Sequence, residues 1–278
     1  MTPQEIAAFT DGPRGGNPAG VLIADTLPTE PEMQRIARDL GHSETAFAMA
    51  EGKTWRVRYF APEGEVPFCG HATIGLGAAL GAAHGAGRYD LTTQAGPVSV
   101  AVRPDGDLWS AELTSPPTRS APLDPDLLTR LLALFDLPPE ALDPRLPPRH
   151  AHGGADHAVL ALRDRARLAA MDYDLNAGQR LMQDAGLVTV SLLHIVDDAT
   201  FDARNAFASG GVLEDPATGA AAAALGGALV DLGWPGLAGG GQVTIRQGDD
   251  MGHPSRLTVT VTGTPGDPVR VAGTARRM

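Results

Sequence analysis

Hydrophobic and polar residues alternate along many short stretches of this chain, and in two places the apolar residues form unbroken runs. Alternation with a period of two predicts half-buried β-strands. The runs at residues 74–80 and 220–232 consist of Ala, Leu, Ile and Gly, apart from Val230 and Asp231 in the second, and are apolar nearly all round. A helix of that kind lies inside a domain, so we expect two buried helices surrounded by β-structure. The predicted strands are residues 5–9, 21–24, 44–50, 55–60, 88–93, 98–103, 108–113, 158–162, 188–196, 200–205, 242–247, 256–262 and 269–272.

The ends of the two apolar runs carry helix start and stop signals. Asp215 suits the N-cap of the second helix, Pro216 its first turn and Gly233 its end. Residues 69–73 lead into the first helix, which ends near Gly85. Helix N-termini present unpaired N–H groups and a positive dipole end, which together bind anions such as carboxylates. We therefore expect a site at these helix starts.

Three further helices have an amphipathic pattern or fitting end signals. Residues 29–40 begin with the capping box Thr29 and Glu32 and end at Gly41. The other two are residues 126–135 and 176–185. We expect the helix at 29–40 to lie on the surface, where it carries no chemistry.

The sequence repeats itself. A shift of 146 positions places Thr54 on Thr200, Arg58 on Arg204 and Cys69 on Asp215, and a shift of 138 aligns residues 15–25 with 153–163. Nine of the 23 prolines lie within residues 114–149, where we place the domain boundary. We predict two homologous halves, residues 1–115, completed by 265–278, and residues 125–264, with a site where the two helix starts meet.

Composition excludes several classes of function. The net charge of −11 disfavours nucleic-acid binding. The single lysine, Lys53, lies in a predicted hairpin turn, which leaves a pyridoxal Schiff base without a good candidate. The single cysteine excludes an internal disulfide and a multi-cysteine metal site. No stretch is long enough to span a membrane and no signal-like leader is seen, so we expect a cytoplasmic protein.

Two groups of residues could carry acid/base or nucleophilic chemistry. Glu44 opens an apolar strand, and a carboxylate in partly dry surroundings can transfer protons near neutral pH. The alternative is an exposed charge at a strand end. Cys69 and His71 could form an activated thiol pair in a hydrolase, whereas the plainer interpretation makes Cys69 a small apolar filler.

Other polar clusters have simpler interpretations. The histidines at 150, 152 and 157 with Asp156 match no regular zinc spacing in a Pro-rich and Gly-rich loop, so we expect no metal site. The loop at residues 10–18 either brings backbone close to a ligand or is a tight surface loop. The acidic pair and serine of the loop at 248–255 could contact a ligand, but we interpret this loop as a solvated turn.

Several motifs occur in the order typical of one family. The chain resembles the PhzF-like phenazine-biosynthesis family, and the motifs extend over nearly its whole length. The matching segments are Asn17-Pro18-Ala19-Gly20-Val21, Gly41-His42-Ser43-Glu44-Thr45-Ala46-Phe47, Arg58-Tyr59-Phe60, residues 65–73, residues 214–219, Gln247-Gly248, Gly252 and Pro254-Ser255. The resemblance implies an α+β, diaminopimelate epimerase-like fold with two pseudo-symmetric halves, each a β-barrel-like sheet around a central helix.

The same resemblance implies a cofactor-free isomerase of a small carboxylate-bearing substrate, commonly a homodimer. Glu44 would shuttle the proton, with His71 and Asp215 as polar helpers. Gly70 and Gly219, with neighbouring N–H groups, would hold the carboxylate. Matching positions add Asn17, Ser43 and Ala220 to the expected substrate site. Two-thiol racemase chemistry is excluded, because Asp215 stands where a second cysteine would be.

Two positions depart from the family pattern. Ala220 stands where a serine usually follows Thr-Gly, and His253 replaces the arginine of a Gly-Arg-Pro-Ser turn. The first change removes a hydroxyl from the expected pocket, and the second either removes a cationic contact or makes it dependent on pH. They motivate an alternative hypothesis, a non-catalytic small-molecule binding or interaction protein on the same fold.

Overall fold

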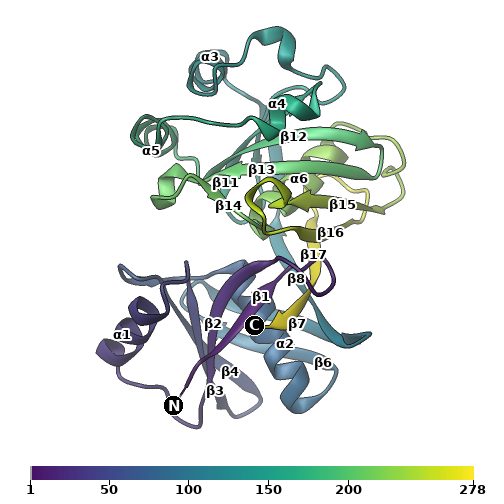
Figure 1. Cartoon of the computed structure of the whole chain (residues 1–278). Coiled ribbons are helices and arrows are strands. Elements are labelled where there is room, and N and C mark those ends of the chain that lie inside the picture. The colour runs from purple at the N-terminus through teal and green to yellow at the C-terminus, as the bar shows by residue number, and fades with distance from the viewer. Residues whose placement is uncertain (1) are drawn as a thin grey trace. The chain divides into compact units, whose positions relative to one another are not determined.

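The computed structural model describes residues 2–278 and divides into two compact units (Figure 1). Unit 1 extends to Thr114 and includes Ala272–Met278, and unit 2 is Ser115–Val271. The chain therefore passes from one unit to the other within two strands, β8 (Leu108–Pro117) and β17 (Pro268–Arg277). No helix among residues 2–278 is long and apolar enough to cross a membrane.

Unit 1 is a closed sheet around one buried helix. Each strand pairs with the next in the order below, and β17 pairs with both β8 and β1, which closes the ring. The strands are β1 (Gln4–Ala8), β2 (Asn17–Ile23), β3 (Thr45–Glu51), β4 (Thr54–Phe60), β6 (Gly87–Thr93), β7 (Gly96–Asp105), β8 and β17, with the short β5 (Glu65–Val66) beside β4.

The central helix of unit 1, α2 (Gly70–His84), is buried at every position from His71 to Gly81. It packs against β1, β2, β3 and β7. Small residues permit this close packing: a Cβ on Gly77 would lie 2.8 Å from Val100 Cγ2. The other helix of unit 1, α1 (Glu30–Leu40), has the predicted capping box, in which the Thr29 N–H donates to Glu32 Oε2 at 2.9 Å.

Unit 2 repeats this plan around α6 (Gly219–Asp231), which packs against β9, β10, β11 and β16. Its strands are β9 (Arg119–Pro122), β10 (Arg149–His152), β11 (Asp156–Leu162), β12 (Thr189–Asp197), β13 (Thr200–Ala206), β14 (Glu214–Asp215), β15 (Gly241–Gln247) and β16 (Ser255–Val261). Its further helices are α3 (Pro125–Leu134), α4 (Arg165–Ala169), α5 (Leu175–Asp184) and the 3-10 turns η1 (Pro139–Ala141), η2 (Ala208–Gly210) and η3 (Asp249–Met251).

The order of strand pairing is the same in both units. In unit 1, β2–β3 is parallel, β3–β4 antiparallel, β4–β6 parallel and β6–β7 antiparallel. In unit 2 the same alternation links β11, β12, β13, β15 and β16. The predicted fold, two pseudo-symmetric halves with a sheet around a central helix, is confirmed.

The structure corrects the predicted repeat at the helix starts. The shift of 146 holds for β4 and β13, but residues 207–213 join β13 to β14 where residues 61–64 join β4 to β5. These three extra residues change the shift to 149. Asp215 therefore corresponds to Val66, since these residues pair with the equivalent positions Asn205 and Tyr59.

The N-cap of α6 is consequently Thr218, and that of α2 is Cys69. The prediction that Asp215 caps the helix was wrong, because the chain forms a short strand at Glu214–Asp215 before the helix begins. The repeat partner of Cys69 is Thr218, a hydroxyl in place of a thiol.

Proline-rich segments hid several elements from the sequence analysis. The segment interpreted as a domain boundary contains β9 and η1 and ends at β10, in addition to the predicted helix at residues 126–135, which is α3. Prolines are confined to edges, strand ends and bulges, so their density disguised these strands. Similarly, Asn17 and Pro18 belong to β2 instead of a loop. The short α4 was also missed.

Three histidines placed in a loop by the sequence lie on strands of unit 2. His150 and His152 contact Asp156 at 3.3 and 3.2 Å. His157 is fully buried in β11, where its Nδ1 lies 2.8 Å from Thr189 Oγ1. Burial lowers the pKa of His157 to about 3, so this imidazole is neutral in the folded protein.

We predict that replacing Gly77 by Val destabilises the protein by at least ~2 kcal/mol, because the added methyl groups collide with β7 and β8. Gly87→Val is the matched control, since a Cβ at this exposed strand position would meet no atom within 4 Å. The control should change the free energy of unfolding by less than ~0.5 kcal/mol. Urea unfolding of both variants measures the difference, and equal stabilities would contradict the close packing of α2.

His157 gives a pH-dependent prediction. The unfolded chain takes up a proton below its ordinary pKa of ~6.5, whereas folded His157 does so only near pH 3. The contribution of the neutral His157 to the free energy of unfolding is therefore fully present at pH 7 and is lost progressively as the pH falls below ~6.5. Between pH 7 and pH 5 the wild type should lose ~2 kcal/mol more than His157→Asn. Urea unfolding at both pH values tests this, with exposed His253→Asn as a control that retains the wild-type loss.

Candidate active site

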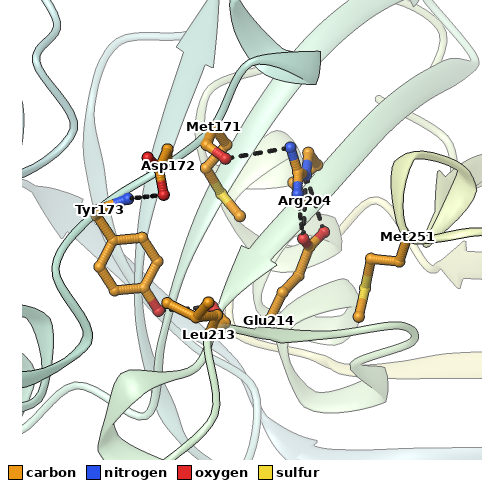
Figure 2. A pocket seen from close by; sticks show the side chains of 7 residues that line it. All are labelled: Met171, Asp172, Tyr173, Arg204, Leu213, Glu214 and Met251. Atoms are coloured by element: carbon orange, nitrogen blue, oxygen red, sulfur yellow. Dashed lines mark hydrogen bonds and ion pairs between the residues drawn. The ribbon is translucent and has the colours of Figure 1, made fainter.

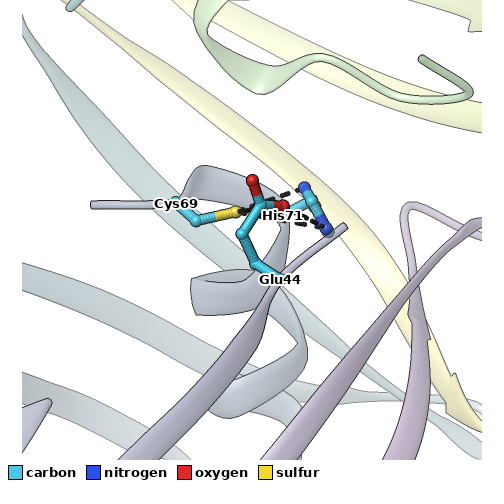
Figure 3. A group of neighbouring side chains, drawn as sticks. All are labelled: Glu44, Cys69 and His71. Carbon is cyan, nitrogen blue, oxygen red and sulfur yellow. Dashed lines mark hydrogen bonds and ion pairs between the residues drawn. The ribbon is translucent and has the colours of Figure 1, made fainter. Parts of the chain in front are cut away.

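In unit 1, Glu44 immediately precedes β3 and turns its side chain toward the start of α2 (Figure 3). The Gly20 N–H donates to the Glu44 carbonyl at 3.2 Å, which extends the β2–β3 pairing and fixes the backbone here. The Glu44 side chain is 18% exposed. The predicted charge at the edge of an apolar strand is thus mostly enclosed and still open to solvent.

Two side chains from the start of α2 contact the Glu44 carboxylate. The Cys69 thiol lies 3.4 Å from Glu44 Oε2 and donates to it, and His71 Nε2 lies 3.5 Å from the same oxygen. Cys69 Sγ and His71 Nδ1 are themselves 3.3 Å apart. The three groups form a compact acid/base cluster, in which a proton can pass between carboxylate, thiol and imidazole over short distances.

Ser43 and Asn17 also lie in this unit. Ser43 Oγ is 3.3 Å from His71 Nε2, which places its hydroxyl at the edge of the cluster. Asn17 is the first residue of β2 and is buried. Gly70 begins α2, and a Cβ there would meet no atom within 4 Å, so space is open beside the helix start.

A buried hydrogen-bond chain anchors the start of α2. The hydroxyls of Tyr59 and Thr73 lie 2.6 Å apart, and Thr73 Oγ1 donates to the Cys69 carbonyl at 2.6 Å. Burial raises the pKa of Tyr59, so the phenol stays protonated. This chain fixes the N-cap residue, and with it the thiol that faces Glu44.

In unit 2, the equivalent helix start is organised by Gln247. Its Nε2 donates to the Asp215 carbonyl at 2.6 Å and to Thr218 Oγ1 at 3.2 Å. Its Oε1 accepts from Thr218 N at 3.3 Å and Asn205 Nδ2 at 3.1 Å. Gln247 is buried at the end of β15. It connects the segment before α6 to the sheet.

Asp215 and Thr218 form a further contact within this segment, in which the Thr218 hydroxyl donates to the Asp215 carboxylate. Gly219 and Ala220 are the first two residues of α6. Asp215, Gly219 and Ala220 therefore gather at one helix start in unit 2, and Glu44, His71, Ser43 and Gly70 gather at the other in unit 1.

The sequence indicated Gln247 only as part of a family motif and did not predict its four hydrogen bonds to Asn205, Asp215 and Thr218. The available signal was a buried polar residue at the end of a predicted strand, directly before Gly248.

The acidic pair Asp249 and Asp250 forms ion pairs with Arg256 and Arg165, at 2.8 and 2.9 Å. The interpretation of this loop as an ordinary turn omitted these pairs.

A cavity of about 270 Å³ lies elsewhere in unit 2 (Figure 2). Arg204 and Glu214 form an ion pair on its wall, with Arg204 Nε and Glu214 Oε1 3.0 Å apart. Successive strand residues point to opposite faces, which separates Glu214 from its neighbour Asp215. None of the predicted site residues lines this cavity, whose lining is Met171, Asp172, Tyr173, Arg204, Leu213, Glu214 and Met251.

We predict that Gln247→Met destabilises the protein by roughly 2–4 kcal/mol, because it leaves polar groups of the buried Asn205 and of the half-buried Asp215 and Thr218 without their amide partner. Gln242→Met is the matched control, since Gln242 lies exposed on the same strand. It should cost less than ~0.5 kcal/mol. Similar urea midpoints for the two variants would show that Gln247 does not hold this segment.

Comparisons with known proteins agree with this architecture. A solved PhzF-family phenazine biosynthesis protein of Bacillus anthracis superposes with a TM-score of 0.88 at 24% identity, covering 99% of this chain and 96% of that one. Likeness at this identity shows the fold. It confirms the predicted fold class, which this chain shares with that PhzF-family protein.

Sequence relatives identify the enzyme class. The uncharacterized isomerase YddE of Escherichia coli K12 is 32% identical, over 99% of this chain and 96% of its own length. A trans-2,3-dihydro-3-hydroxyanthranilate isomerase of Pseudomonas chlororaphis is also 32% identical, over 93% of this chain and 89% of its own. These relatives confirm the predicted class, an isomerase. Because the family model of the phenazine biosynthesis-like proteins matches residues 6–278, this chain belongs to the PhzC-PhzF family.

Proposed function

We propose that this protein is a cofactor-independent isomerase that moves a proton on a small carboxylate-bearing metabolite, with Glu44 as the acid/base residue. The observation that carries the proposal is the position of the Glu44 carboxylate, within 3.5 Å of both the Cys69 thiol and the His71 imidazole. A partly enclosed carboxylate beside two other proton-carrying groups suits reversible proton transfer.

The start of α2 supports binding of an anionic substrate. Its first N–H groups and the positive end of the helix dipole stabilise an anion by ~0.3–1 kcal/mol, and by up to ~2 kcal/mol when partly buried. The open space beside Gly70 allows a carboxylate to approach this backbone. A carboxylate held there would bring the neighbouring carbon atoms near Glu44, which favours proton transfer by orientation.

Ser43 and His71 are proposed to complete the polar environment in unit 1. The Ser43 hydroxyl and His71 Nε2 lie 3.3 Å apart, so the two groups can share a proton or bind one substrate atom together. Asn17, at the start of β2, is proposed as a further substrate contact.

In unit 2, we propose Asp215 as a second polar helper and the N–H groups at Gly219 and Ala220 as donors to the substrate. The Thr218 hydroxyl and the Gln247 amide hold this segment in one conformation, which is what a substrate-binding backbone requires. Ala220 presents a methyl group, so any contact it makes through its side chain is apolar.

The relative from Pseudomonas chlororaphis is named for trans-2,3-dihydro-3-hydroxyanthranilate, a molecule that carries a carboxylate. We propose a substrate of this chemical class for the present chain. The methyl group of Ala220 and the imidazole of His253 favour a substrate whose polar contacts differ from those of relatives with serine and arginine at these positions.

Glu44→Gln should abolish deuterium incorporation from D2O into a substrate that the wild type turns over, with a rate loss of at least ~10²-fold. The amide keeps the shape of the side chain but cannot accept the proton. The probes are trans-2,3-dihydro-3-hydroxyanthranilate and a panel of small carboxylic acids, followed by NMR. Glu51→Gln, on an exposed residue at the far end of β3, is the matched control and should retain exchange.

Full exchange in a folded Glu44→Gln variant would remove Glu44 from the mechanism. Because of Ala220 and His253, the experiment also tests a second function, that of a small-molecule binding protein without catalysis. Binding of a panel member to the wild type without turnover, unaffected by Glu44→Gln, would favour that function.

A further inference from the structure

The Glu44, Cys69 and His71 side chains have a second property besides acid/base chemistry. Within residues 2–278 they form the one group of three His, Cys, Asp or Glu side chains whose ligand atoms all lie within 4.8 Å of one another. A thiolate, an imidazole and a carboxylate are the three side-chain ligands that Zn²⁺ uses in proteins. Figure 3 shows all three pointing toward one another.

The spacing of the donor atoms fits a single tetrahedral ion. Zinc bond lengths of ~2.3 Å to sulfur and ~2.0–2.2 Å to nitrogen or oxygen separate ligands at tetrahedral angles by about 3.4–3.6 Å. Here Cys69 Sγ lies 3.4 Å from Glu44 Oε2 and 4.0 Å from His71 Nε2, and that nitrogen lies 3.5 Å from Glu44 Oε2. Shifts of a few tenths of an ångström complete three corners of a tetrahedron.

Access and charge also suit a cation. The Glu44 side chain is 18% exposed, so an ion can enter from solvent and keep a water molecule as its fourth ligand. The Cys69 backbone is held by Thr73, whose own hydroxyl lies 2.6 Å from that of Tyr59, and outer contacts of this kind orient metal ligands. The thiolate and the carboxylate together balance a charge of two.

We propose that Glu44, Cys69 and His71 bind a thiophilic divalent cation such as Zn²⁺, and that the bound ion blocks proton transfer by occupying the Glu44 carboxylate. Binding displaces the proton of the Cys69 thiol into solvent, so affinity rises with pH. The site itself stands on geometry alone, whereas the inhibitory effect rests on the proposed function.

The experiment uses the full chain, freed of metal by chelation, without substrate. Co²⁺ should bind one ion per chain and produce a thiolate-to-cobalt charge-transfer absorption, which Zn²⁺ then removes by displacement. Cys69→Ser should abolish the absorption and weaken Zn²⁺ binding by more than ~100-fold, beyond the loss typical for outer-shell partners. His71→Asn should weaken Zn²⁺ binding to a similar degree, while circular dichroism and thermal melting verify that each variant is folded.

The His150, His152 and Asp156 cluster supplies the matched control, because it also combines imidazoles with a carboxylate but lacks a thiol. His152→Asn should bind Co²⁺ and Zn²⁺ as the wild type does. Absence of the charge-transfer absorption in the wild type, unchanged Zn²⁺ affinity in Cys69→Ser, or loss of binding in His152→Asn would overturn the proposal. Since no substrate is present, these outcomes are independent of deuterium exchange through Glu44.

Discussion

The fold depends on enclosing a helix that has no polar face. Burying α2 and α6 removes a large apolar surface from water, and the Gly and Ala residues of these helices let the strands approach closely. Gly77 lies against β7 and β8 with no room for a side chain, and Gly226 of α6 is similarly enclosed by Val259. The enclosed helices then have little polar surface except at their first turns, which is where the candidate chemistry gathers.

The N-cap residues of α2 and α6 differ in their side chains and in the residues that hold them. In unit 1 the cap is a thiol fixed through Thr73 and Tyr59, and it faces the carboxylate of Glu44, the residue before β3. In unit 2 the cap is a hydroxyl fixed by Gln247, and it faces a carboxylate from its own segment. A duplicated architecture has thus retained its backbone plan while exchanging the polar groups that hold each cap.

Local signals in the sequence were sufficient for most helices and most strands. The capping box at Thr29 and Glu32, the apolar runs and the alternating strands depend on neighbours a few residues apart, so their pattern can be read along the chain. The strands at Arg119 and Arg149 could not be read this way, because prolines dominate their surroundings. The change of the repeat offset from 146 to 149 after β13 was also not predicted, because an insertion of three residues in a loop does not alter the hydrophobic pattern of the strands beside it.

The candidate site was predictable in part. Glu44 was suggested by a charge beside an apolar strand, whereas Gly70 and Gly219 were implied by the resemblance to the PhzF-like family. The contact between Glu44 and Cys69 joins residues 25 positions apart, and the one between Gln247 and Thr218 joins residues 29 positions apart. Sheet pairing creates such contacts, and the sequence specifies that pairing only through the whole set of strands.

The closure of the first sheet by β17 has a consequence for biosynthesis. Arg277, Arg276 and Ala275 pair with Ile6, Ala7 and Ala8, so among the residues described the last strand made lies beside the first. Until β17 has been translated, the sheet of unit 1 is open between β1 and β8, and the backbone groups that later pair with β17 have no strand partner there. By then nearly all of unit 2 has already been synthesised. Unit 1 is therefore translated first, but its sheet closes only when the last strand, β17, has been made.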